Sequence, residues 1–90
     1  MKAIVIKVCN KKESKHGGDY ILSIFKNIDE NSNGEEYPFY CYLENENSSR
    51  FLKYLKPQAI FENIQVITWK NKKVISGNSN FIFIGIRHEK

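Results

Sequence analysis

The stretch Tyr37-Pro38-Phe39-Tyr40-Cys41-Tyr42-Leu43 predicts a β-strand with two different faces. Side chains on a strand point alternately to opposite sides. One side holds residues typical of a core strand, which are Tyr37, Phe39, Cys41 and Leu43. The other side holds Pro38, Tyr40, Tyr42 and Glu44. The second face therefore carries a tyrosine pair where an antiparallel strand usually presents polar residues to water.

The tyrosine pair has two interpretations. Spaced, amphipathic aromatic side chains are suited to stacking on nucleic-acid bases. Tyrosine is also a good strand former, and two tyrosines can simply cover a partly buried sheet. This strand alone does not distinguish base stacking from sheet cover.

The length of 90 residues predicts one domain over residues 1–90 with a single hydrophobic core. The proportions of hydrophobic residues (41%) and charged residues (27%) are typical of a soluble globular protein. The longest apolar runs are too short to span a membrane, and the N-terminal residues lack a signal-peptide pattern. We therefore expect a cytoplasmic protein without a membrane partner.

The charges are unevenly distributed along the chain. Residues 1–28 contain six lysines and two acidic residues, whereas residues 29–46 contain six acidic residues and no basic ones. Residues 47–90 contain eight basic residues and two acidic ones. A polar molecule with a basic face is expected, and such a face favours an anionic partner.

Alternating patterns predict four further strands, over residues 2–8, 20–28, 59–69 and 81–87, with brief pairing at Val74 and Ile75. Glu62 and Asn63 interrupt the third of these strands and suggest a bulge. The segment Asp29 to Glu36 predicts the turn of a hairpin.

A short helix is expected between the tyrosine strand and the strand at residues 59–69. Phe51, Leu52 and Leu55 recur at helical spacing, and Pro57 ends the pattern. Either Asn47 or Ser48 is expected to cap this helix. Because two turns are too short to be stable alone, the helix is predicted to insert into the core.

Three strands, a short helix and two strands predict an all-β domain, a five-stranded Greek-key barrel. This layout resembles that of the OB-fold, over nearly the whole chain, and no specific family motif accompanies it. A β-grasp domain would place its helix after two strands, and an RRM-like domain would have two helices. A small SH3-like barrel is the alternative.

Resemblance to OB-fold nucleic-acid binders implies a site on the exposed face of the second and third strands. The loops joining strands one to two and four to five would flank it. The expected aromatic residues are Phe25, Tyr40, Tyr42 and Trp69, and the expected basic residues are Lys11, Lys12, Lys15, Lys70, Lys72 and Lys73. Lysines would contact phosphates and aromatic rings would stack on bases.

The first functional hypothesis is binding of single-stranded nucleic acid, with DNA favoured and little sequence preference. The role expected with this hypothesis is in replication or recombination. Lys, Asn and Ile, whose codons are AT-rich, form more than a third of the chain, which indicates an origin in an AT-rich genome, phage or mobile element. The alternative is a protein-interaction module, such as an accessory subunit or inhibitor of a polymerase, primase, helicase or nuclease. In that case the same aromatic residues would form a protein interface.

Enzymatic activity is not expected from this sequence. It has no phosphate-binding glycine loop and no nucleophile elbow. Cys9 and Cys41 lack the spacing of a zinc site and are expected to be buried thiols. We therefore predict no cofactor and no metal.

Overall fold

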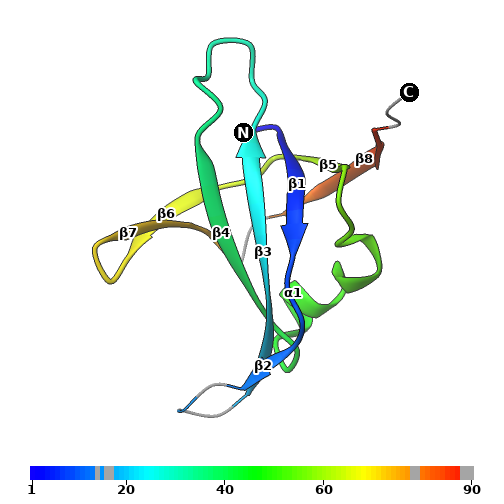
Figure 1. The fold of residues 1–90 in the computed structure, drawn as a ribbon. Helices are drawn as coiled ribbons and strands as arrows, with labels where there is room; N and C mark the ends of the chain where they lie inside the picture. Colours follow the sequence, from blue (N-terminus) through cyan, green and yellow to red (C-terminus); the bar gives the residue numbers. More distant parts are fainter. Residues whose placement is uncertain (14, 16–17, 78–79, 88–90) are drawn as a thin grey trace.

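Strands form most of the regular structure in the computed structural model, which describes residues 1–13, 15, 18–77 and 80–87 (Figure 1). The strands are β1 (Ala3–Val8), β2 (Lys12–Glu13), β3 (Asp19–Asn27), β4 (Glu36–Tyr42), β5 (Ala59–Glu62), β6 (Val66–Trp69), β7 (Lys72–Ile75) and β8 (Ile82–Ile86). All of the described strand pairs are antiparallel. The predicted all-β class is confirmed.

Strand β3 pairs with three other strands of the larger sheet. Along one edge it pairs with β1 and, nearer its start, with β2, and along the other edge it pairs with β4. Strand β5 continues the sheet beyond β1, and β8 follows β5. Strands β6 and β7 form a separate two-stranded sheet, which lies to the left in Figure 1. Apart from β2, the strands of the larger sheet therefore run in the order β4-β3-β1-β5-β8.

The described strands form an open sheet, whereas a closed or nearly closed barrel is expected from the sequence. Within the described residues, β4 pairs only with β3, and β8 pairs only with β5. The strand expected over residues 59–69 is also divided, because Asn63 adopts a left-handed backbone conformation with φ of 60°. The predicted bulge is thus a complete break. It allows β6 to leave the larger sheet and pair with β7.

Much of the core is formed by phenylalanine rings from β3, β4, β5 and the residue before β8. The ring centre of Phe25 on β3 lies 5.7 Å from that of Phe39 on β4 and 5.7 Å from that of Phe61 on β5. The ring centre of Phe81, the residue just before β8, lies 6.1 Å from that of Phe25. Burial of each ring contributes about 1.5–3 kcal/mol. These contacts hold β3 and β4 against β5 and β8.

The expected two-turn helix is replaced by two shorter turns, α1 (Glu46–Ser49) and the 3₁₀ turn η1 (Leu52–Tyr54). Phe51 and Leu55 nevertheless belong to the core cluster, with Leu52 packed against it, so the predicted insertion of these side chains is confirmed. The side chains of Asn47 and Ser48, the expected caps, lie outside the described part. No helix described here has the length and apolar character needed to span a membrane.

Candidate functional site

The two faces of β4 differ as the sequence predicts. Phe39 and Cys41 are buried in the core, whereas Tyr40 and Tyr42 are half-buried on the outer face. The register with β3 is regular from Tyr20 to Lys26, so one outer surface extends over both strands. The tyrosine pair is therefore accessible from outside the sheet.

A third tyrosine, which the sequence analysis missed, completes this surface. Tyr20 on β3 lies directly opposite Tyr42 on β4, and directly opposite residues share a face of the sheet. The ring centre of Tyr20 lies 5.4 Å from that of Tyr42 and 5.7 Å from that of Tyr40. Alternation along β3 already groups Tyr20 with Leu22 and Ile24, and only the register shows that this group shares the outer face.

Phe25 does not belong to the outer surface. Its side chain is completely buried, with an exposed fraction of 0%, in the phenylalanine core. The prediction that Phe25 lies beside Tyr40 and Tyr42 is therefore wrong. Neighbouring Ser23 shares the inner face of β3 and is also fully buried, so this face belongs to the core despite its serine.

Trp69 reaches the tyrosines because β6 and β7 form a tight hairpin. The two turn residues, Lys70 and Asn71, have φ values of 51° and 64°, as in a type I′ turn, whose twist suits a two-residue hairpin. The indole of Trp69 is 41% exposed, and its ring centre lies 5.6 Å from that of Tyr40. Residues far apart in the sequence thus form one aromatic surface, which we call the aromatic face: Tyr20, Tyr40, Tyr42 and Trp69.

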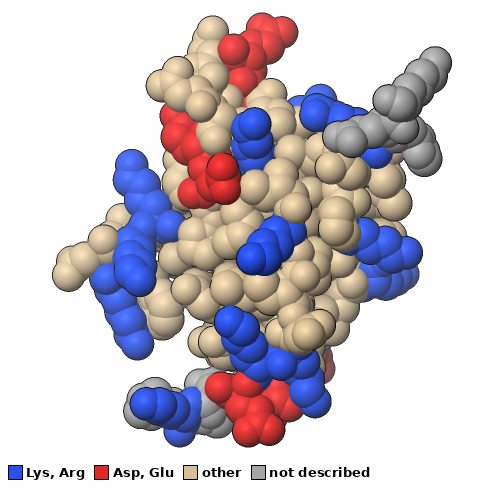
Figure 2. Space-filling model, viewed as in Figure 1, with Lys and Arg blue, Asp and Glu red and all other residues tan. Residues whose placement is uncertain are grey.

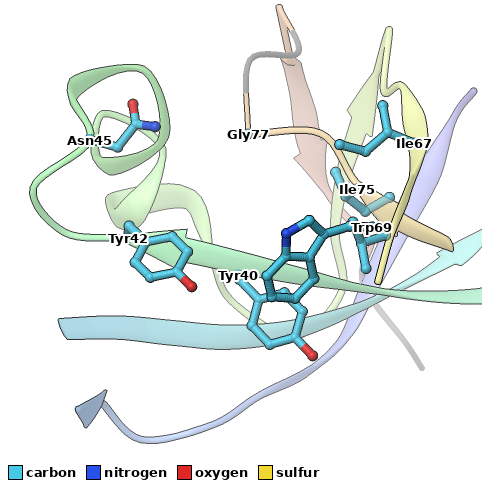
Figure 3. Close-up of a pocket in the computed structure, with 8 residues that line it drawn as sticks. Tyr40, Tyr42, Asn45, Ile67, Trp69, Ile75 and Gly77 are labelled. Atoms are coloured by element: carbon cyan, nitrogen blue, oxygen red, sulfur yellow. The ribbon is translucent and has the colours of Figure 1, made fainter. Parts of the chain in front are cut away.

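A pocket of about 220 Å³ opens at the aromatic face. It is lined by Tyr40, Tyr42, Asn45, Ile67, Trp69, Val74, Ile75 and Gly77. In Figure 3, Tyr42 and Asn45 come from one side, and Trp69, Ile67 and Ile75 come from the other. The hairpin side of the pocket is therefore largely aliphatic and aromatic.

The three lysines of the hairpin differ in orientation. The Nζ atom of Lys70 lies 4.6 Å from the centre of the Trp69 indole, so a positive charge is held beside the ring. Lys72 lies directly opposite Trp69 and shares its face, whereas Lys73 lies opposite Thr68 on the other face of the hairpin. Lys70 and Lys72 therefore border the aromatic face, and Lys73 points away from it.

The lysines before β3 are also divided. Lys12 lies opposite Tyr20 and extends the row formed by Tyr20 and Tyr42. Lys11 instead makes an exposed ion pair with Asp19, with 3.4 Å between Nζ and Oδ2. Lys15 is exposed, and its neighbours at positions 14 and 16 lie outside the described residues. Of these three lysines, Lys12 is the one that the register places on the aromatic face.

Two further lysines that were not expected from the sequence, Lys7 and Lys26, lie on the same side of the sheet. Lys7 on β1 is exposed and lies opposite Ile24, which shares the outer face with Tyr20. Figure 2 shows basic side chains over β1 and β3 and over the β6–β7 hairpin, and acidic side chains both on the loop between β3 and β4 at the top and near β2 at the bottom. The aromatic face is thus bordered by lysines and ends towards an acidic loop.

The described side chains include no group of three or more His, Cys, Asp or Glu residues that could hold a metal ion. Burial raises the pKa of the Cys41 thiol to about 11, so this thiol is protonated and unreactive at neutral pH. The aromatic face presents ring surfaces, with the charged side chains of Lys70 and Lys72 beside them. No family model, no curated protein and no solved structure matches this chain.

Proposed function

We propose that this chain binds single-stranded DNA on the aromatic face. The observation that carries the proposal is the meeting of Trp69 with Tyr40, at 5.6 Å between ring centres, beside Tyr20 and Tyr42. Stacking of a base on an aromatic side chain contributes about 1–3 kcal/mol and tolerates any sequence. Several rings on one surface can therefore bind successive bases.

The lysines around the aromatic face supply the second part of the proposal. Lys70 and Lys72 border it on the hairpin side, and Lys7 and Lys12 lie on the side of β1 and β2. Such ammonium groups can contact phosphates on both sides of a strand whose bases stack on the rings. Acidic side chains on the loop between β3 and β4 and near β2 would repel phosphates, so we propose that the strand crosses the aromatic face between these two acidic regions.

We also propose that the fold is a partly open Greek-key barrel of the OB type. In a Greek key, three consecutive strands are followed by a fourth that returns to lie beside the first. The order β5-β1-β3-β4 supports this arrangement, with β5 as the returning strand. The β6–β7 hairpin would then be the loop between the fourth and fifth barrel strands, which flanks the binding face in OB-fold proteins.

The test uses Trp69, the one tryptophan of the chain, as an intrinsic probe. Titration with oligo-dT at several salt concentrations should quench its fluorescence, with an affinity that falls as salt rises. Tyr40→Ala and Tyr42→Ala should each weaken binding by about 1–3 kcal/mol, whereas the Phe variants should bind nearly as well as the wild type.

Tyr54→Ala is a suitable control for these tyrosine variants. Tyr54 stacks on Phe83, at 4.4 Å between ring centres, and is not part of the aromatic face. This variant should affect stability and leave affinity unchanged. Equal affinities of the folded Tyr40→Ala and Tyr42→Ala variants and the wild type would contradict the proposal.

A second candidate function, protein binding, is favoured by a different surface. Ile82, Ile84 and Ile86 on β8 are 54%, 47% and 42% exposed. In the described part of the chain β8 is an end strand of the sheet, and it carries neither lysine nor proline, which commonly protect such edges. A partner could add a strand there. Loss of a co-purifying nucleic-acid enzyme on Ile84→Lys, with unchanged DNA affinity, would support this second function.

A further inference from the structure

The pocket beside Trp69 and Tyr40 has a size suited to one base. Its volume of about 220 Å³ lies below the range of about 300–1,000 Å³ that is usual for drug-sized ligands. The rings of Tyr42 and Trp69 stand on opposite sides of it (Figure 3). A single planar ring system could enter while its sugar and phosphate stay outside, near Lys70 and Lys72.

The hairpin wall of the pocket is formed by Ile67, Val74 and Ile75, of which Ile67 and Val74 lie directly opposite each other and share the face of Trp69. Val74 and Ile75 are only 5% and 3% exposed, whereas Ile67 is 46% exposed and offers most of the accessible aliphatic surface of this wall. These side chains have no hydrogen-bonding group. A base edge with a carbonyl, amine or ring nitrogen would lose water against them and gain no partner, at a cost of about 1–3 kcal/mol.

We propose that this pocket recognises the 5-methyl group of thymine in single-stranded DNA, an inference that rests on the proposed function. The C5–C6 edge of a pyrimidine has no hydrogen-bonding group, so it is the edge that the aliphatic wall can accept. On this edge thymine carries a methyl group, which makes favourable apolar contacts with protein side chains. Uracil lacks the methyl group, and the corresponding purine edge carries the acceptor N7.

The expected preference follows from the size of one methyl group. Burial of a group of this size contributes about 0.8 kcal/mol, which corresponds to about a fourfold difference in affinity. Oligo-dT should therefore bind about fourfold more tightly than oligo-dU of the same length. These strands share the deoxyribose backbone and charge, so the lysine contacts cancel in the comparison. Oligonucleotides of 5-methylcytosine and cytosine provide a second pair, with the same preference expected.

A methyl group can also strengthen stacking on any aromatic ring, and a variant of the wall separates that effect from recognition in the pocket. Ile67→Ala should reduce the ratio of oligo-dT to oligo-dU affinity to nearly one. Ile82→Ala is the matched control, since Ile82 on β8 is also an exposed isoleucine, at 54% against 46% for Ile67, and does not line the pocket. This control should keep the fourfold ratio.

The outcomes are distinguishable. Equal affinity of the wild type for oligo-dT and oligo-dU would overturn the methyl proposal and leave single-strand binding intact. A fourfold ratio that persists in Ile67→Ala would also overturn it, because the preference would then arise outside the aliphatic wall. Binding of neither strand would overturn the proposed function, and the methyl proposal with it.

Discussion

Lys72 and Lys73 provide a sharp test of the proposed binding face. They are adjacent in the sequence, both are exposed, and both belong to β7. Their side chains nevertheless lie on opposite faces of the hairpin, since Lys72 pairs with Trp69 and Lys73 with Thr68. Lys72→Gln and Lys73→Gln change the net charge equally at nearly the same place. A difference between them must therefore come from which face contacts the DNA.

The magnitude follows from counterion release. On single strands, each phosphate contact contributes about 0.7 to the slope of log affinity against log salt concentration. Lys72→Gln should lower the slope by about 0.7, and Lys73→Gln should leave it unchanged. Expressed as affinity, the advantage of the wild type over Lys72→Gln should shrink by about 2.6-fold for each fourfold increase in salt.

The assay should avoid tryptophan fluorescence, because Lys72 lies beside Trp69 and its replacement can alter the emission. Anisotropy of an end-labelled oligo-dT, measured at several salt concentrations, reports the slope directly. Lys70→Gln should behave like Lys72→Gln, since Lys70 also borders the indole. Equal slopes for Lys72→Gln and Lys73→Gln would refute the facing argument, and slopes equal to the wild type in all variants would remove the hairpin from the site.

Four further predictions concern the core and the site. Leu55→Ala, at a buried position beside η1, should lower the free energy of unfolding by about 2–5 kcal/mol in a denaturant titration, and a loss near zero would show that this segment does not fill the core. Tyr20→Ala should weaken oligo-dT binding by about 1–3 kcal/mol, whereas Phe25→Ala should lower stability by about 3–5 kcal/mol; the reverse pattern would contradict the assignment of faces on β3. At neutral pH a thiol reagent should label half-buried Cys9 faster than buried Cys41, and equal rates would contradict the burial of Cys41. Because the pKa of Cys41 is raised from 9.0 to about 11, its contribution to stability should be complete below pH 9 and decline as the pH rises towards 11.

The sequence allows the faces of individual strands to be predicted, because alternation is a local property. It separates Phe39 and Cys41 from Tyr40 and Tyr42, and the structure agrees. It does not show which face of β3 is the inner one. Ser23 is a polar residue on the same face as Phe25, yet it is fully buried, with Val8 of β1 opposite it on one side and Phe39 of β4 on the other. The register between β3 and β4 shows which face of β3 is the inner one, and a register cannot be read from one strand alone.

The position of Trp69 depends on a backbone feature that strand patterns do not report. An uninterrupted strand over residues 59–69 would extend β5 along β1 and carry Trp69 with it. The left-handed conformation of Asn63 ends β5, and the turn at Lys70 and Asn71 then folds β7 back against β6. Asparagine tolerates this conformation better than most residues, so the sequence permits the break without requiring it. The contact between β7 and β4 then carries Trp69 to Tyr40, and a lysine-rich turn becomes one border of an aromatic surface.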